Sequence, residues 1–110
     1  MEESEAILQT YGLIKTALTE KFGSEGYLIA GQEENDPVFG SMYTLWSNNA
    51  DVIRLTWDGK ENIFVVEVTN DLPITPLTSW TSISITAFDR QYKNSKDIYD
   101  TAQKVIKSID

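Results

Sequence analysis

The chain has 110 residues, of which 41% are hydrophobic and 24% charged, a composition that fits a globular domain rather than a disordered segment. Its formal net charge of −8 argues against binding to nucleic acid or anionic lipid. Cysteine and histidine are both absent, which excludes disulfides, Ser-His-Asp and Cys-His sites, and the usual ligands of zinc, copper and nickel. We therefore expect no cofactor, no transition-metal site and no enzymatic activity.

Hydrophobic residues never form a run long enough to span a membrane, so we expect no membrane association. Residues 1–5 are acidic where a secretory signal would be basic, which predicts a cytoplasmic protein. The length predicts a single α+β domain over residues 1–110.

The charge is unevenly distributed along the chain. Residues 1–71 carry 13 acids and 4 bases, net −9, whereas residues 72–110 carry 4 acids and 5 bases, net +1. Either the two halves neutralise each other within the fold, or the first half presents an acidic face to a cationic partner.

Residues 4–22 have the pattern of an amphipathic helix, with Ser4 as the expected N-cap and Gly23 as the expected stop. The apolar positions recur at steps of three and four residues: Ile7, Tyr11, Ile14 and Leu18. A second helix is expected over residues 95–109, where apolar residues have the same spacing, with a start anywhere from Asp89 to Ser95.

Between the two helices the hydrophobic period changes to two, which predicts strands. The expected strands are residues 27–32, 39–46, 51–57, 62–69 and 78–88. Short connections make consecutive strands antiparallel neighbours. The sequence thus predicts the order α-β-β-β-β-β-α, with an N-terminal helix, a curved antiparallel meander of four to five strands and a C-terminal helix.

The fifth expected strand alternates between apolar and hydroxyl-bearing residues. We expect the set that contains the apolar residues to face the core, namely Thr81, Ile83, Ile85 and Ala87. The other set, Ser82, Ser84 and Thr86, is expected to face outward.

Asp58 and Gly59 predict a hairpin turn between the third and fourth strands. A loop of four residues beginning at Asp58 would place Leu55 opposite Phe64 and keep the apolar face continuous. A loop of the two turn residues alone would place Leu55 opposite Asn62. Because register follows the face that must be buried, we predict the longer loop.

The order of elements also predicts an acidic pole. In a meander, the connections after the first and third strands lie at one end of the sheet, and a helix antiparallel to the first strand begins there too. The residues expected at this pole are Glu2, Glu3, Glu5, Glu33, Glu34, Asp36, Asp58 and Glu61. Lys60 opposes them, and the end of the fifth strand would bring Arg90, Lys93 and Lys96 to neutralise part of the charge.

The three tryptophans have different expected positions. Trp57 is in phase with the apolar side of its strand and is expected in the core. For Trp46 the alternation does not decide between a buried and an exposed position. Trp80 is out of phase with the strand that follows it. Either its ring lies on the outer face as an interface anchor, or the connection containing Pro76 folds over it.

These features predict a non-enzymatic protein-interaction module whose acidic pole binds a basic protein partner. An inhibitor of a toxin would be one concrete form, because bacterial immunity proteins are similar to this chain in size and charge. The predicted partner-binding residues are Glu33, Glu34, Asp36, Asp58, Glu61 and Trp80.

Two alternatives remain open. The first is an oligomerising scaffold, a homodimer formed through an apolar outer sheet face that includes Val52, Ile63 and Val65. The second is a carrier that holds a small apolar ligand between the sheet and a helix.

Overall fold

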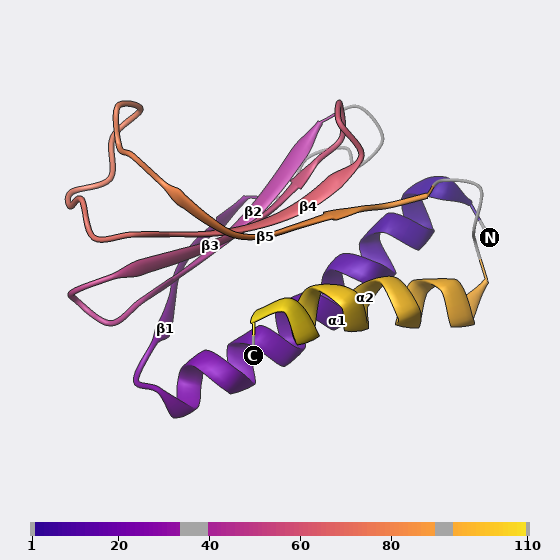
Figure 1. The fold of residues 1–110 in the computed structure, drawn as a ribbon, viewed down its shortest axis with the longest axis horizontal. Coiled ribbons are helices and arrows are strands. Elements are labelled where there is room, and N and C mark those ends of the chain that lie inside the picture. The colour runs from indigo at the N-terminus through magenta and orange to yellow at the C-terminus, as the bar shows by residue number, and fades with distance from the viewer. Residues whose placement is uncertain (1, 34–39, 90–93, 110) are drawn as a thin grey trace.

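The computed structural model describes residues 2–33, 40–89 and 94–109. Its elements are α1 (Glu3–Ser24), β1 (Leu28–Glu33), β2 (Ser41–Ser47), β3 (Val52–Asp58), β4 (Ile63–Thr69), β5 (Thr81–Ala87) and α2 (Ser95–Ile109). The strands form one antiparallel five-stranded sheet in the order β1-β2-β3-β4-β5, and both helices lie on one face of it (Figure 1). The predicted α+β meander between two helices is confirmed.

One hydrophobic core fills the space between the sheet and the helices. Its fully buried large side chains come from α1 and from β2, β3, β4 and α2: Ile7, Ile14, Leu18, Met42, Trp46, Leu55, Trp57, Phe64, Val66 and Val105. Trp46 and Trp57 are both 0% exposed, so Trp57 lies where the sequence places it and Trp46 joins it in the core.

The two ends of α1 differ from the expected ones. The helix begins at Glu3, so Ser4 lies inside it and is not its cap. At the other end the helix continues past Gly23, and the chain turns at Gly26, whose φ is +90°. A glycine adopts this left-handed conformation without a Cβ clash, which makes Gly26 the residue that redirects the chain into β1.

Among the described residues, no helix is long and apolar enough to cross a membrane.

The register between β3 and β4 differs from the predicted one by two residues. Leu55 lies opposite Val66, not Phe64, and the last pair before the turn is Asp58 with Ile63. The connection therefore has the predicted four residues but starts one residue later, at Gly59. A shift of two residues leaves every side chain on its own face of the sheet, so the predicted core face is unchanged.

The side chain of Asp58 explains where this turn begins. Its Oδ1 accepts hydrogen bonds from the backbone N–H groups of Lys60, at 2.9 Å, and Glu61, at 3.2 Å. Asn62 then takes a left-handed conformation, with φ of 56°, which asparagine tolerates better than most residues. The strand pairing thus extends to Asp58, because its carboxylate accepts hydrogen bonds from the backbone N–H groups of the turn that follows.

The predicted orientation of β5 holds for Thr81 and Ser82, which pair with Val68 and Glu67, but is wrong after the register shift at Ile83. Ser84 faces the core and is 6% exposed, whereas Ile83 and Ile85 point outward, and Ile85 is 63% exposed. Ser84 lies opposite Val66 on β4, and its hydroxyl forms a 2.6 Å hydrogen bond with that of Ser108 on α2. The register shift at Ile83 reverses the alternation for the rest of the strand, and the hydroxyl partner on α2 allows Ser84 to be buried there.

Candidate functional site

The described members of the acidic pole lie at one end of the molecule. The start of α1, the turn between β3 and β4 and the end of β5 are all found at this end, on the right in Figure 1. The acidic residues that the structure places there are Glu2, Glu3, Glu5, Glu33, Asp58 and Glu61. Two of the predicted residues, Glu34 and Asp36, lie outside the described residues.

The structure adds two acidic residues to this end. Asp89 follows β5, and Asp97 lies in the first turn of α2, whose start is capped by Asn94: its Oδ1 accepts the Asp97 N–H at 2.9 Å. The end of the fifth strand was expected to bring basic residues to the pole. Of these, Arg90 and Lys93 lie outside the described residues, Lys96 lies in the first turn of α2 next to Asp97, and Lys60 lies in the β3–β4 turn.

The acidic residues of the pole do not all have the same role. Asp58 is committed to the turn through its two backbone hydrogen bonds. Glu2, Glu5 and Glu61 are exposed to solvent. In the described parts of the chain, no three acidic side chains converge in a way that could hold a metal ion. The carboxylates are spread over a surface, which suits contact with a broad cationic surface better than coordination of a cation.

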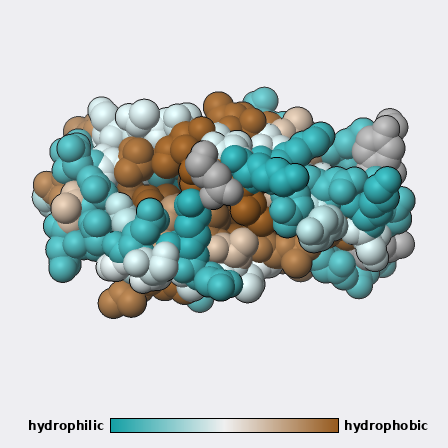
Figure 2. Space-filling view, turned by 60° about the horizontal axis from the view of Figure 1, so that its bottom comes forward, coloured by the Kyte–Doolittle hydropathy of each residue, from teal (hydrophilic) through white to brown (hydrophobic). Residues whose placement is uncertain are grey.

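The hydrophilic character of this end is visible from the helix side. Figure 2 shows hydrophobic residues gathered over the middle of that face and hydrophilic residues covering the end at which α1 begins. Exposed Leu8 and Leu13 of α1 contribute apolar surface to the molecule. The acidic pole is therefore a polar end of the molecule rather than the rim of an apolar patch.

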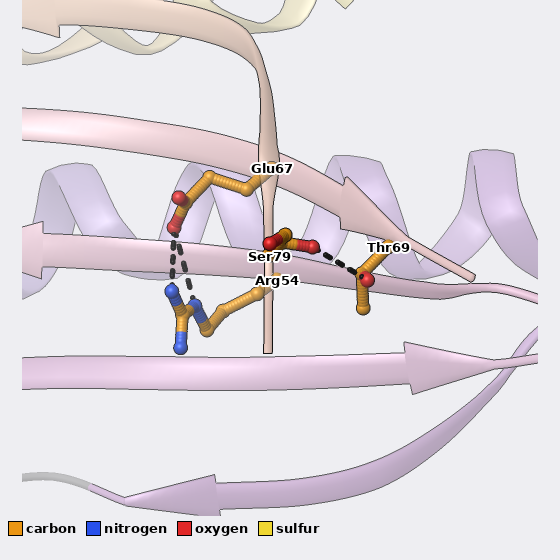
Figure 3. A network of polar contacts seen from close by, with 4 residues as sticks. All are labelled: Arg54, Glu67, Thr69 and Ser79. Atoms are coloured by element: carbon orange, nitrogen blue, oxygen red, sulfur yellow. Dashed lines mark hydrogen bonds and ion pairs between the residues drawn. The ribbon is translucent and has the colours of Figure 1, made fainter. Parts of the chain in front are cut away.

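A second cluster surrounds Trp80 on the face of the sheet opposite the helices. The guanidinium carbon of Arg54 lies 4.0 Å from the centroid of the Trp80 ring, a cation–π contact. The same guanidinium donates from Nη2 and Nε to Oε1 of Glu67, at 2.9 and 3.2 Å (Figure 3). The contact with Arg54 places the ring of Trp80 on the outer face, where it is half-buried and the Pro76 connection lies beside it, so each of the two interpretations holds in part.

The connection between β4 and β5 also reaches this cluster. Thr69 Oγ1 donates to the carbonyl of Ser79 at 2.8 Å, which holds the end of the connection against β4 (Figure 3). A surface pocket of about 550 Å³ lies along α1, and one of about 320 Å³ lies beside Trp80. The residues lining the smaller pocket are Tyr43, Leu45, Arg54, Ile74, Thr75, Pro76 and Trp80. The Pro76 connection thus borders Trp80 and leaves a hollow beside it.

The outer sheet face of the scaffold alternative carries both buried and exposed apolar residues, among them Ile85 at 63% exposed, and this alternative stays a prediction. Val52, paired with Thr69 in the register, is 5% exposed, while Ile63 and Val65 are half-buried. The ligand-carrier alternative gains no support, because fully buried side chains fill the space between sheet and helices.

Sequence reasoning singled out Trp80 but missed its partner Arg54. Arg54 lies on β3 and Trp80 directly precedes β5, so the two residues are far apart in the sequence. They meet only because β3 and β5 belong to one sheet. The available signal was phase: Arg54 and Trp80 are both out of phase with the apolar positions of their strands.

Comparisons with protein-family models, with curated proteins and with solved structures gave no match to this chain. A function is therefore argued from the surfaces of the molecule themselves.

Proposed function

We propose that this protein is a non-enzymatic protein-binding domain and that its acidic pole binds a basic surface of a partner protein. One observation carries the proposal: the fold brings exposed carboxylates from α1 and from the β3–β4 turn, Glu2, Glu5 and Glu61, to the same end. These residues are separated in the sequence, so the concentration of charge is a property of the fold.

An acidic pole of this kind changes the rate at which the protein meets a charged partner. In physiological salt the field of exposed charges extends about one Debye length, near 8 Å. Within that range, a negative end attracts and orients a cationic surface, which raises the association rate more than it raises equilibrium affinity. Rapid inhibition of a basic toxin is one function that such a surface would serve. The cytoplasmic location stays a prediction, which fractionation of the native host would check.

The test compares two variants of equal net charge. The pole variant replaces Glu2, Glu5 and Glu61 with glutamine. The control variant carries Glu20→Gln, Glu25→Gln and Asp71→Asn, three exposed residues at the end of α1 and in the β4–β5 connection. Asp58 is left unchanged because its carboxylate holds a turn.

A partner is first isolated from the native host with the unmodified protein as bait, and association rates are then measured at low and physiological salt. We expect the pole variant to associate about tenfold more slowly at low salt and to show a flatter salt dependence. The control variant should stay close to the unmodified protein. Equal effects of the two variants, or no effect of either, would contradict the proposal.

The pocket beside Trp80 is a second candidate binding surface. It is favoured by the half-buried ring, the adjacent guanidinium of Arg54 and a volume of about 320 Å³. Partly exposed tryptophan is a frequent anchor of protein interfaces. If this surface binds the partner, Trp80→Ala should abolish binding while the pole variant binds normally.

A further inference from the structure

The pocket beside Trp80 is lined by hydrogen-bond donors that have no acceptor in the described chain. The indole N–H of Trp80 and the hydroxyl of Tyr43 make no hydrogen bond with the described residues. Arg54 donates from Nε and Nη2 to Glu67, which leaves Nη1, the nitrogen that points away from Glu67 in Figure 3. These donors keep contact with solvent, because among the described side chains the unpaired polar atom that is buried belongs to Thr56. The pocket can therefore offer three donor groups to an occupant.

The rest of the lining is largely apolar. Leu45 on β2, and Ile74 and Pro76 in the β4–β5 connection, lie around the pocket together with the rings of Tyr43 and Trp80. Aromatic rings beside aliphatic side chains form a surface on which another apolar ring can pack. The volume of about 320 Å³ is at the lower end of the range for ligand pockets, so the pocket suits a short segment.

The wall formed by the β4–β5 connection is held by its own hydrogen bonds. The N–H of Thr78 donates to the carbonyl of Thr75 at 3.0 Å, and the N–H of Thr75 donates to the hydroxyl of Thr78 at 2.8 Å. The N–H of Leu77 donates to the hydroxyl of Thr75 at 3.1 Å. A wall that is ordered before binding lowers the entropic cost of taking up an occupant.

The acidic residues near the pocket argue against an anionic occupant. Glu67 is paired with Arg54, and Glu33 lies opposite Tyr43 on the same face of the sheet. The chain as a whole carries a net charge of −8. The pocket therefore favours acceptor oxygens that carry no negative charge, and positive charge beside them is attracted by the chain. Backbone carbonyl groups of a basic peptide meet both conditions.

A proline-rich segment is the kind of peptide that best matches these donors. Proline has a backbone carbonyl but no N–H, so a run of prolines brings acceptors without adding donors. Such a run already adopts the extended polyproline helix, which lowers the entropy lost on binding. Its rings dock on grooves that are lined by aromatic side chains.

We propose that the pocket beside Trp80 binds a short proline-rich segment that carries basic residues, with Trp80, Arg54 and Tyr43 donating to its carbonyl oxygens. This pocket lies on the sheet face opposite the helices and is separate from the acidic pole. Its test uses synthetic peptides instead of the native partner of the pole. Failure of this proposal and failure of the proposed function are therefore distinguishable.

Nuclear magnetic resonance tests the binding, because the three tryptophans give separate indole N–H signals. We expect an oligoproline peptide flanked by arginines to shift the signal of Trp80 and to leave those of the buried Trp46 and Trp57 in place. A peptide with the same arginines, in which glycine and serine replace the prolines, should bind about tenfold more weakly because it must be ordered on binding. Absence of binding, or equal affinity of the two peptides, would overturn the proposal.

Conservative substitutions test the donors. Tyr43→Phe and Trp80→Phe each keep an aromatic ring and remove one donor, so each should weaken binding of the proline peptide about three- to tenfold in calorimetric titration. The matched control, Tyr99→Phe, removes the same hydroxyl from an exposed residue of α2 and should bind normally. If both pocket variants bind as tightly as the unmodified protein, these donors do not hold the peptide and the proposal fails.

Discussion

Three hydrogen bonds that involve side-chain hydroxyl groups join distant parts of the chain at the border of the core. Tyr11 and Thr44 share a hydrogen bond of 2.7 Å, and the indole N–H of Trp46 donates to Thr19 at 3.2 Å. The hydroxyl of Ser84 contacts that of Ser108. A buried polar group without a partner is costly, so these contacts fix how α1 and α2 sit on the sheet.

At the residue scale, we predict that Tyr11→Phe lowers the free energy of unfolding by about 1–3 kcal/mol, because it leaves the buried Thr44 hydroxyl without this partner. Urea unfolding followed by circular dichroism measures the loss. Adding Thr44→Val removes the orphaned hydroxyl and should recover part of the stability. A double variant less stable than Tyr11→Phe alone would contradict this explanation.

At the element scale, the β3–β4 turn depends on one carboxylate oxygen. Asp58→Ala removes the acceptor for the N–H groups of Lys60 and Glu61. It should lower the free energy of unfolding by about 0.5–1.5 kcal/mol for each lost hydrogen bond. Asp58→Asn keeps an oxygen in the same place and should unfold close to the unmodified protein. The comparison, made by urea unfolding, separates the structural role of Asp58 from its charge. Equal destabilisation by both substitutions would show that the charge itself holds the turn.

At the scale of the whole molecule, a single core joins both helices to β2, β3 and β4. We therefore predict one cooperative unfolding transition. Trp46 and Trp57 are fully buried in this core, so their fluorescence reports its packing, while far-ultraviolet circular dichroism reports the helices and the sheet. The two signals should change at the same urea concentration. A fluorescence change that precedes the loss of circular dichroism would indicate that the core loosens before the elements unfold.

The position of the acidic pole could be predicted from the order of the helices and strands alone. Consecutive antiparallel strands force the β3–β4 turn and the start of α1 to the same end, so Glu5 and Glu61 could be placed together from the sequence. Asp89 and Asp97 were not predicted as members, because Arg90, Lys93 and Lys96 stand between them and make the segment look basic in the sequence.

Hydrophobic periodicity in the sequence determined the type and order of the elements and the core faces of β3 and β4, because those faces are large and strongly apolar. Only the tertiary structure decided the phase of β5, the register of the β3–β4 hairpin and the contact of Arg54 with Trp80. In each case the alternatives differ little in local pattern. For β5 and for Arg54 the choice depends on a partner elsewhere in the chain, the hydroxyl of Ser108 and the ring of Trp80. For the hairpin it depends on the hydrogen bonds that Asp58 accepts from the backbone of its own turn, which the hydrophobic pattern does not show.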